Sequence, residues 1–82
     1  MQNKKSLAPG EKKILITLTR ANKTFTQLLK DARLPGSVLS QYLKNLQKKH
    51  YIKRDIDTHK YGLTKKGIRV CELLSELIKL GG

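Results

Sequence analysis

The side chains best suited to chemistry in this sequence are hydrogen-bonding and cationic groups spaced along residues 37–48. At about 100° per residue in a helix, these side chains share one face, and that face carries no carboxylate. They are Ser37, Ser40, Gln41, Lys44, Asn45 and Lys48. A glutamine or asparagine amide offers a donor and an acceptor that match the edge of adenine, and lysine attracts phosphate. This face therefore predicts binding to a nucleic acid, the alternative being an ordinary solvated helix face.

A second group of basic side chains follows within a short hairpin. Arg54, His59 and Lys60 are candidates to contact the sugar-phosphate backbone or the minor groove of DNA. Asp55 and Asp57 in the same hairpin would be repelled by phosphate. An exposed edge hairpin that its charges protect from aggregation is an equally good interpretation. Further candidates for phosphate contacts, beside helix N-termini, are Lys12, Lys13, Thr26 and Gln27.

The sequence presents no convincing catalytic or metal-binding constellation. It has six carboxylates without an obvious pair, and it has no glycine-rich phosphate loop. The single cysteine, Cys71, excludes an intramolecular disulfide and a cysteine-rich zinc site. The two histidines, His50 and His59, lack a ligand-like spacing. We therefore expect a protein that is not an enzyme and that uses no cofactor and no metal.

Charge is the strongest signal in the overall composition. The 82 residues include 18 lysines and arginines against six acidic residues, which gives a net charge of +12. Residues 44–69 hold nine of the basic side chains and two of the acidic ones, so this segment alone carries +7. Such a balance is typical of a protein that binds a polyanion, although plain solubility is the alternative. Without a long apolar run or a hydrophobic leader, we expect one intracellular, cytoplasmic domain that is associated with DNA and not with a membrane.

Three helices are expected to hold the candidate side chains. The first begins at Pro9 and ends at Asn22-Lys23, with an apolar face formed by Ile14, Leu15, Leu18 and Ala21. After a short β-prone stretch at Thr24-Phe25, Thr26 is expected to cap a second helix that ends at Leu34-Pro35-Gly36. Its buried side is formed by Leu28, Leu29 and Ala32. The third helix runs from residues 35–37 to about Lys49, and its core stripe is Leu39, Tyr42, Leu43 and Leu46.

The hydrophobic period then changes from helix to strand. Residues 51–56 alternate, residues 57–60 form a turn, and residues 61–63 return as a second strand. Thr64 is placed to cap a last helix from about Lys65 to Leu80. The expected order is thus helix, short strand, helix, turn, helix, hairpin, helix. This order predicts a helix-turn-helix followed directly by a basic hairpin.

At this point the sequence resembles a known family. Leu39-Ser40-Gln41-Tyr42-Leu43-Lys44-Asn45-Leu46, followed by Tyr51-Ile52-Lys53-Arg54, resembles the recognition helix and first wing strand of winged-helix regulators of the MarR, ArsR and PadR kind. Tyr61-Gly62-Leu63-Thr64-Lys65-Lys66-Gly67 is similar to their Tyr-x-Leu-Thr-x-x-Gly junction between wing and last helix. The resemblance covers residues 11–80, and the size is similar to that of small dimeric winged-helix proteins of archaea and their viruses. One departure is His50, which stands where those regulators usually have a glycine, so a left-handed histidine or a different helix ending is expected.

The resemblance implies a mainly α fold with a small β hairpin, which is a winged helix-turn-helix with an extra C-terminal dimerisation helix. Residues 1–8 would be a flexible basic tail, residues 9–64 the winged helix-turn-helix domain, and residues 65–82 the dimerisation helix. The implied function is a homodimeric, sequence-specific transcription regulator that binds double-stranded DNA. The recognition helix would lie in the major groove and the wing on the backbone or minor groove. Two alternatives stay open, a weakly specific architectural DNA binder and a winged-helix module that binds protein or RNA.

The last helix is too apolar to serve a single core. Its apolar side chains form two overlapping stripes, of which only one can cover the core of its own domain. The other would face water in a monomer, so we expect pairing with a second copy across a two-fold axis. The expected interface is Val70, Cys71, Leu74, Leu77 and Ile78. The alternative is that the N-terminal segment of the same chain covers this helix.

Overall fold

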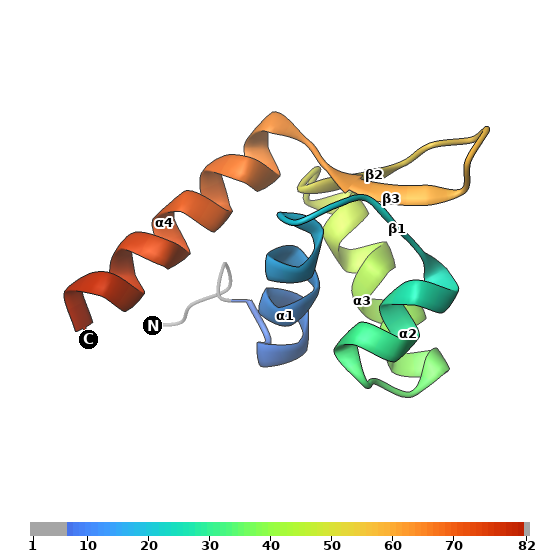
Figure 1. Ribbon diagram of the computed structural model, residues 1–82, viewed down its shortest axis with the longest axis horizontal. Helices are drawn as coiled ribbons and strands as arrows, with labels where there is room; N and C mark the ends of the chain where they lie inside the picture. Colours follow the sequence, from blue (N-terminus) through green and yellow to red (C-terminus); the bar gives the residue numbers. More distant parts are fainter. Residues whose placement is uncertain (1–6, 82) are drawn as a thin grey trace.

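The computed structural model describes residues 7–81, with side chains described as far as Leu74. These residues form four helices and three short strands (Figure 1). In chain order they are α1 Pro9–Leu18, β1 Lys23–Thr24, α2 Phe25–Ala32, α3 Gly36–Lys48, β2 Ile52–Arg54, β3 Lys60–Leu63 and α4 Lys65–Gly81. The architecture confirms the predicted fold class, a mainly α winged helix-turn-helix.

The core lies between α1, α2, α3 and the start of β2. Its buried side chains are Ile14, Leu15, Leu18, Leu28, Ala32, Leu39, Leu43, Leu46 and Ile52. These are the faces that the helical periodicity predicts, with one exception. Ala21 is exposed, because α1 ends at Leu18 and not at Asn22. The Thr19 hydroxyl donates to the Ile16 carbonyl over 2.6 Å and thereby closes the last turn early.

The cap of α2 also differs from the prediction. Thr24, and not Thr26, precedes the helix, in an extended conformation with φ −79° and ψ 169°. Its hydroxyl accepts from the Gln27 amide N–H at 3.2 Å, and the Gln27 side-chain oxygen accepts from the Thr24 amide N–H at 2.9 Å. This reciprocal capping box satisfies two amides at once, which the simple cap at Thr26 would not do. Strand β1 therefore passes into α2 without a loop.

The three strands form one antiparallel sheet in the order β1-β3-β2. The β2–β3 hairpin is the expected wing, and its register pairs Ile52 with Leu63 and Arg54 with Tyr61. The structure adds a contact that the sequence did not indicate, because β3 also pairs with β1 through Lys23 and Tyr61. The wing is thereby anchored to the segment that begins α2.

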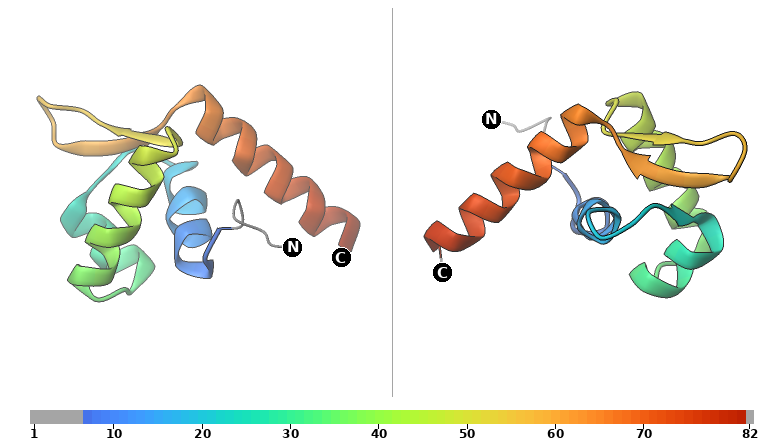
Figure 2. Two further views of the ribbon diagram at one scale, coloured as in Figure 1. Left: turned by 180° about the vertical axis from the view of Figure 1, so that it is seen from behind. Right: turned by 45° about the horizontal axis from the view of Figure 1, so that its top comes forward.

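The junction between α3, the wing and α4 depends on a left-handed histidine. His50 has φ 64°, which confirms the expected left-handed residue at the position of the family's glycine. Thr64 caps α4 as predicted, since its hydroxyl accepts from the Gly67 amide N–H at 3.0 Å. The same hydroxyl donates to the His50 carbonyl over 2.5 Å. From this junction α4 leaves the body at the base of the wing and extends outward on the side of α1 (Figure 2).

Candidate nucleic-acid interface

The predicted recognition residues share the open face of α3. Leu39, Leu43 and Leu46 on the opposite face are buried, so the helix cannot rotate about its axis without exposing them. Seen from behind, α3 lies at the front of the body with no element across it, and the wing projects beside it (Figure 2, left). The exposed members of the face are Ser37, Gln41, Lys44 and Lys48, and the half-buried ones are Ser40 and Asn45.

Two of these side chains are already paired with each other. Gln41 donates from Nε2 to Oδ1 of Asn45, over 3.2 Å and one helical turn. The second Nε2 hydrogen and the Gln41 carbonyl oxygen remain available in the same plane for a base edge. Within residues 7–81, the ion pairs join Lys23 to Asp31 and Lys49 to Glu11. Among the side chains that the structure describes, residues 7–74, no carboxylate therefore neutralises Lys44 or Lys48.

An aspartate shapes the tip of the wing. The Asp55 carboxylate accepts from the amide N–H groups of Asp57 at 2.8 Å and Thr58 at 3.1 Å. These hydrogen bonds, first that of Thr58, hold the pKa of Asp55 below its usual value, because they favour the charged form. Asp55, which the sequence analysis expects phosphate to repel, is thus a structural part of the wing turn.

The basic candidates of the wing lie close to that turn. Arg54 at the end of β2 is hydrogen-bonded to Nδ1 of His59 over 2.7 Å, and His59 has a left-handed φ of 60°. Lys60 is exposed at the start of β3, in register with Thr24 of β1. The structure therefore brings Arg54 and His59 together, whereas Lys60 follows on the strand that joins the wing to β1.

Of the remaining candidates for phosphate contacts, Lys13 and Gln27 form hydrogen bonds within the domain, and Lys12 and Thr26 are exposed. The Lys13 ammonium donates to the carbonyl of Ala32 over 3.1 Å, at the C-terminal end of α2. Gln27 belongs to the capping box, and Lys12 is exposed on α1. Thr26 is exposed and lines a polar hollow of about 510 Å³ together with Thr24, Phe25, Gln47, Arg54, His59 and Tyr61. Sequence reasoning did not identify Gln47 or Tyr61 as candidate binding residues, because this hollow is assembled from three separate segments.

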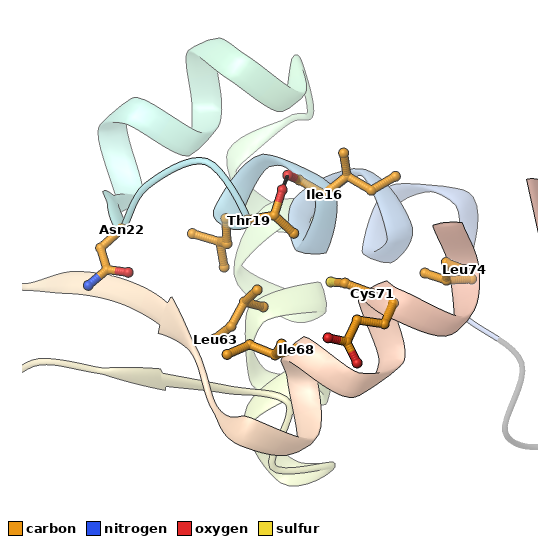
Figure 3. Close-up of a pocket in the computed structure, with 9 residues that line it drawn as sticks. Ile16, Thr19, Asn22, Leu63, Ile68, Cys71 and Leu74 are labelled. Carbon is orange, nitrogen blue, oxygen red and sulfur yellow. Dashed lines mark hydrogen bonds between the residues drawn. The ribbon is translucent and has the colours of Figure 1, made fainter. Parts of the chain in front are cut away.

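An apolar groove of about 670 Å³ separates α1 from α4 (Figure 3). Ile68, Cys71 and Leu74 extend into it from α4.

Of the expected interface residues, Val70 and Cys71 pack partly against the domain's own core. Burial raises the pKa of the Cys71 thiol above its usual value. Leu77 and Ile78 lie outside the described side chains, while Ile16, Ile68 and Leu73 are 44%, 46% and 51% exposed.

The described part of the chain shows neither a metal site nor a membrane span. No group of three or more histidine, cysteine or acidic side chains among residues 7–74 is arranged to hold a metal ion. None of the helices described there is long and apolar enough to cross a membrane.

Comparison with known proteins connects this geometry with a family. A family model described as winged helix-turn-helix matches residues 12–81. No curated protein sequence matches the chain.

Several solved structures share the fold. A mutant of Staphylococcus aureus MepR is 25% identical with a TM-score of 0.83, over 89% of this chain and 59% of that one. Another structure of MepR, described as a transcription regulator of the S. aureus multidrug efflux pump MepA, is 24% identical with a TM-score of 0.82, over 90% and 59% of the two chains. Lactococcus lactis ZitR is 21% identical with a TM-score of 0.73, over 98% and 62%. The chain thus spans less than two thirds of each of these proteins, and their fold confirms the expected MarR-like winged helix.

Proposed function

The chain belongs to the winged helix-turn-helix family, and from that premise we propose that it is a sequence-specific regulator that binds double-stranded DNA as a homodimer. The observation that carries the proposal is the face of α3. That face is open, rich in hydrogen-bonding groups and free of acids, while the opposite face is locked into the core. A helix of this kind fits the major groove, where base edges present distinct patterns of donors and acceptors.

The N-terminal half of α3 suits base contact. Gly36 has nothing within 4 Å of the place where a side chain would begin, so the helix can approach the floor of the groove closely. Ser37 and Ser40 are also small, and Gln41 offers the bidentate amide that matches adenine. Lys44 and Asn45 follow one turn later and reach either base edges or the backbone. Lys48 stands at the end of α3, where a phosphate contact is expected.

The wing adds contacts outside the major groove. Arg54, His59 and Lys60 are exposed, and the hairpin that carries them projects beside α3. In the proposed complex they contact the backbone or the adjacent minor groove. These contacts contribute affinity and register, whereas sequence preference comes from α3.

The homodimer is proposed from apolar surface that one copy leaves open. Ile16, Ile68 and Leu73 are each about half exposed. Ile16 and Ile68 line the groove between α1 and α4, and Leu73 precedes Leu74, which also lines it. A second copy supplies a matching apolar surface through a two-fold axis, as most soluble oligomers do. In this arrangement Leu74, and with it the predicted Leu77 and Ile78, would contact the partner. Two recognition helices would then read two half-sites.

Selection of bound duplexes from random DNA tests the proposal, followed by a footprint on the selected sequence. We expect a two-fold symmetric site with half-sites about one helical turn apart, or a multiple of one turn. Uniform coating without a selected sequence would favour an architectural DNA binder, which the net charge of +12 also suits. Failure to bind duplex DNA even at low salt would favour the module that binds protein or RNA.

A further inference from the structure

The polar hollow beside the wing is the second feature of this surface that fits an anion. Three segments of the chain surround it: the junction of β1 and α2 at residues 24–26, the C-terminal half of α3 through Gln47, and the wing through Arg54, His59 and Tyr61. Its volume of about 510 Å³ leaves ample space for a phosphate group. The exposed or half-exposed state of all these side chains leaves the hollow accessible from solvent.

The lining offers donors and positive charge without a carboxylate. Arg54 supplies the guanidinium, Gln47 the amide, and Thr26 and Tyr61 the hydroxyls. One guanidinium N–H group of Arg54 is directed at Nδ1 of His59, with 2.7 Å between the two nitrogens. His59 therefore holds Arg54 in place, while the other N–H donors of Arg54 stay available. The nearby acid, Asp55, does not line the hollow, and its Oδ1 accepts from two amides of the wing turn.

The position of the hollow follows from how a winged helix lies on DNA. If α3 occupies the major groove and the wing reaches the adjacent minor groove, the sugar-phosphate backbone that separates the two grooves must cross between them. The hollow has the lining expected of that position, with Gln47 from α3 and Arg54, His59 and Tyr61 from the wing. We infer that it is a clamp for a single backbone phosphodiester, an inference that rests on the proposed DNA-binding function.

This inference defines roles that the sequence left open. Arg54 contacts the backbone and not the minor groove, and it does so as a positioned group because His59 fixes its guanidinium. Gln47 closes the clamp from α3, one turn beyond Lys44. Thr26 donates its hydroxyl from the start of α2. His59 is then a positioning residue for Arg54.

A pair of variants with the same change in net charge tests the clamp on any duplex that the protein binds. Gln47→Glu introduces a negative charge into the hollow, whereas Lys30→Gln removes a positive charge at an exposed position of α2 that does not line the hollow. We expect Gln47→Glu to weaken duplex binding at least about tenfold, because like charges in an interface repel strongly. Lys30→Gln should change binding by no more than the small general effect of lost net charge. Equal weakening by the two variants would overturn the inference, and circular dichroism would check that both fold.

Single neutral methylphosphonates, scanned through each strand of the selected duplex, locate the phosphate. One position per half-site should weaken the wild-type protein several-fold and should have little further effect on the Arg54→Gln variant. If every position affects Arg54→Gln as much as it affects the wild type, no phosphate lies in the clamp although DNA is bound. If no duplex is bound at all, the proposed function itself fails. Inorganic phosphate at constant ionic strength should not compete, because the clamp holds a phosphodiester that the flanking grooves present; specific competition would indicate a site for free phosphate and overturn the inference.

Discussion

On the open face of α3, the Gln41 side chain donates a hydrogen bond to Asn45 one turn later, with 3.2 Å between Nε2 and Oδ1. The two residues were singled out separately in the sequence as candidates to read adenine. In the structure they form one unit, in which Asn45 orients the amide plane of Gln41. An oriented amide loses less conformational entropy when it binds a base than a free side chain would.

Base reading by this pair can be tested with alanine variants of α3. Gln41→Ala should cost about 1–3 kcal/mol at the selected site and relax the preference for one base pair. Asn45→Ala should relax the same preference, and the double variant should lose less than the sum of the two. Binding to the selected site and to scrambled DNA measures both effects. If Gln41→Ala weakens both DNAs equally, α3 does not read bases through this residue.

Lys48→Ala is the matched control on the same helix. The ammonium of Lys48 is a point charge without directional preference, and Lys48 is the last residue of α3. We expect all sequences to be weakened about equally, with the slope of log affinity against log salt reduced by roughly one unit. A sequence-dependent effect of Lys48→Ala would place this residue among the base contacts.

Affinity for duplex DNA should fall steeply with salt concentration, because a protein with a net charge of +12 binds DNA largely by releasing counterions from its phosphates. With six to ten phosphate contacts, the loss between about 50 and 200 mM salt would be about 10³- to 10⁵-fold. Fluorescence anisotropy on a labelled duplex measures the slope. Binding that stays flat over this range would contradict an electrostatic interface.

The proposed dimer can be tested by substitution of the exposed apolar side chains of α4. Leu73→Glu should yield monomers that keep their helical content, because Leu73 is 51% exposed and contributes little to the core of its own subunit. Ile56→Glu is the control, since Ile56 is 81% exposed on the wing and should leave the dimer intact. Sedimentation at micromolar concentration measures the oligomeric state of each variant and of the wild-type protein. A wild-type protein that sediments as a monomer would rule out the proposed assembly.

Two glycines allow a matched test of the junction that places α4. A Cβ at Gly67 would lie 2.0 Å from the Tyr51 carbonyl oxygen, whereas one at Gly36 would meet nothing within 4 Å. Gly67→Ala should therefore lower the free energy of unfolding by roughly 3 kcal/mol, more than alanine restores by helix propensity. Gly36→Ala should leave it unchanged or slightly raised. Urea unfolding followed by circular dichroism compares them, and equal stabilities would contradict the tight contact at Gly67.

The wing turn should respond to pH through Asp55. Its pKa in the folded protein lies below the value of a free aspartate, so its hydrogen bonds are fully formed above the unfolded pKa and are lost as the pH falls through the folded pKa. The amide resonances of Asp57 and Thr58 should therefore shift with a midpoint below that of a free aspartate, such as one in a short reference peptide. Asp55→Asn should abolish this titration and keep the turn, because an amide oxygen still accepts. A midpoint at or above that of the reference peptide would show that these bonds do not favour the carboxylate.

Local pattern accounts for what the sequence predicted well. The stripe of Leu39, Leu43 and Leu46 determined which face of α3 is buried, and thereby which face carries Gln41 and Lys44. At His50 the motif on either side left two alternatives, a left-handed residue or a different helix ending, and the structure has the left-handed residue. Where two local signals competed, the prediction was wrong. Thr24 caps α2 in place of Thr26, because Gln27 three residues later completes a capping box. Helix α1 ends before Ala21, and the Thr19 hydroxyl donates to the Ile16 carbonyl at that end.

The sequence by itself determined the elements, their buried faces and the basic character of the surface, since periodicity and charge are properties of single segments. Only the tertiary structure decided which segments meet. Pairing of β3 with β1 brings the wing against the start of α2, and Thr26, Gln47 and Arg54 come to line one hollow as a result. The Thr64 and Gly67 contacts direct α4 outward and leave the apolar groove beside α1. Such relations depend on sheet register and on caps that join distant residues, and hydrophobic periodicity carries no information about either.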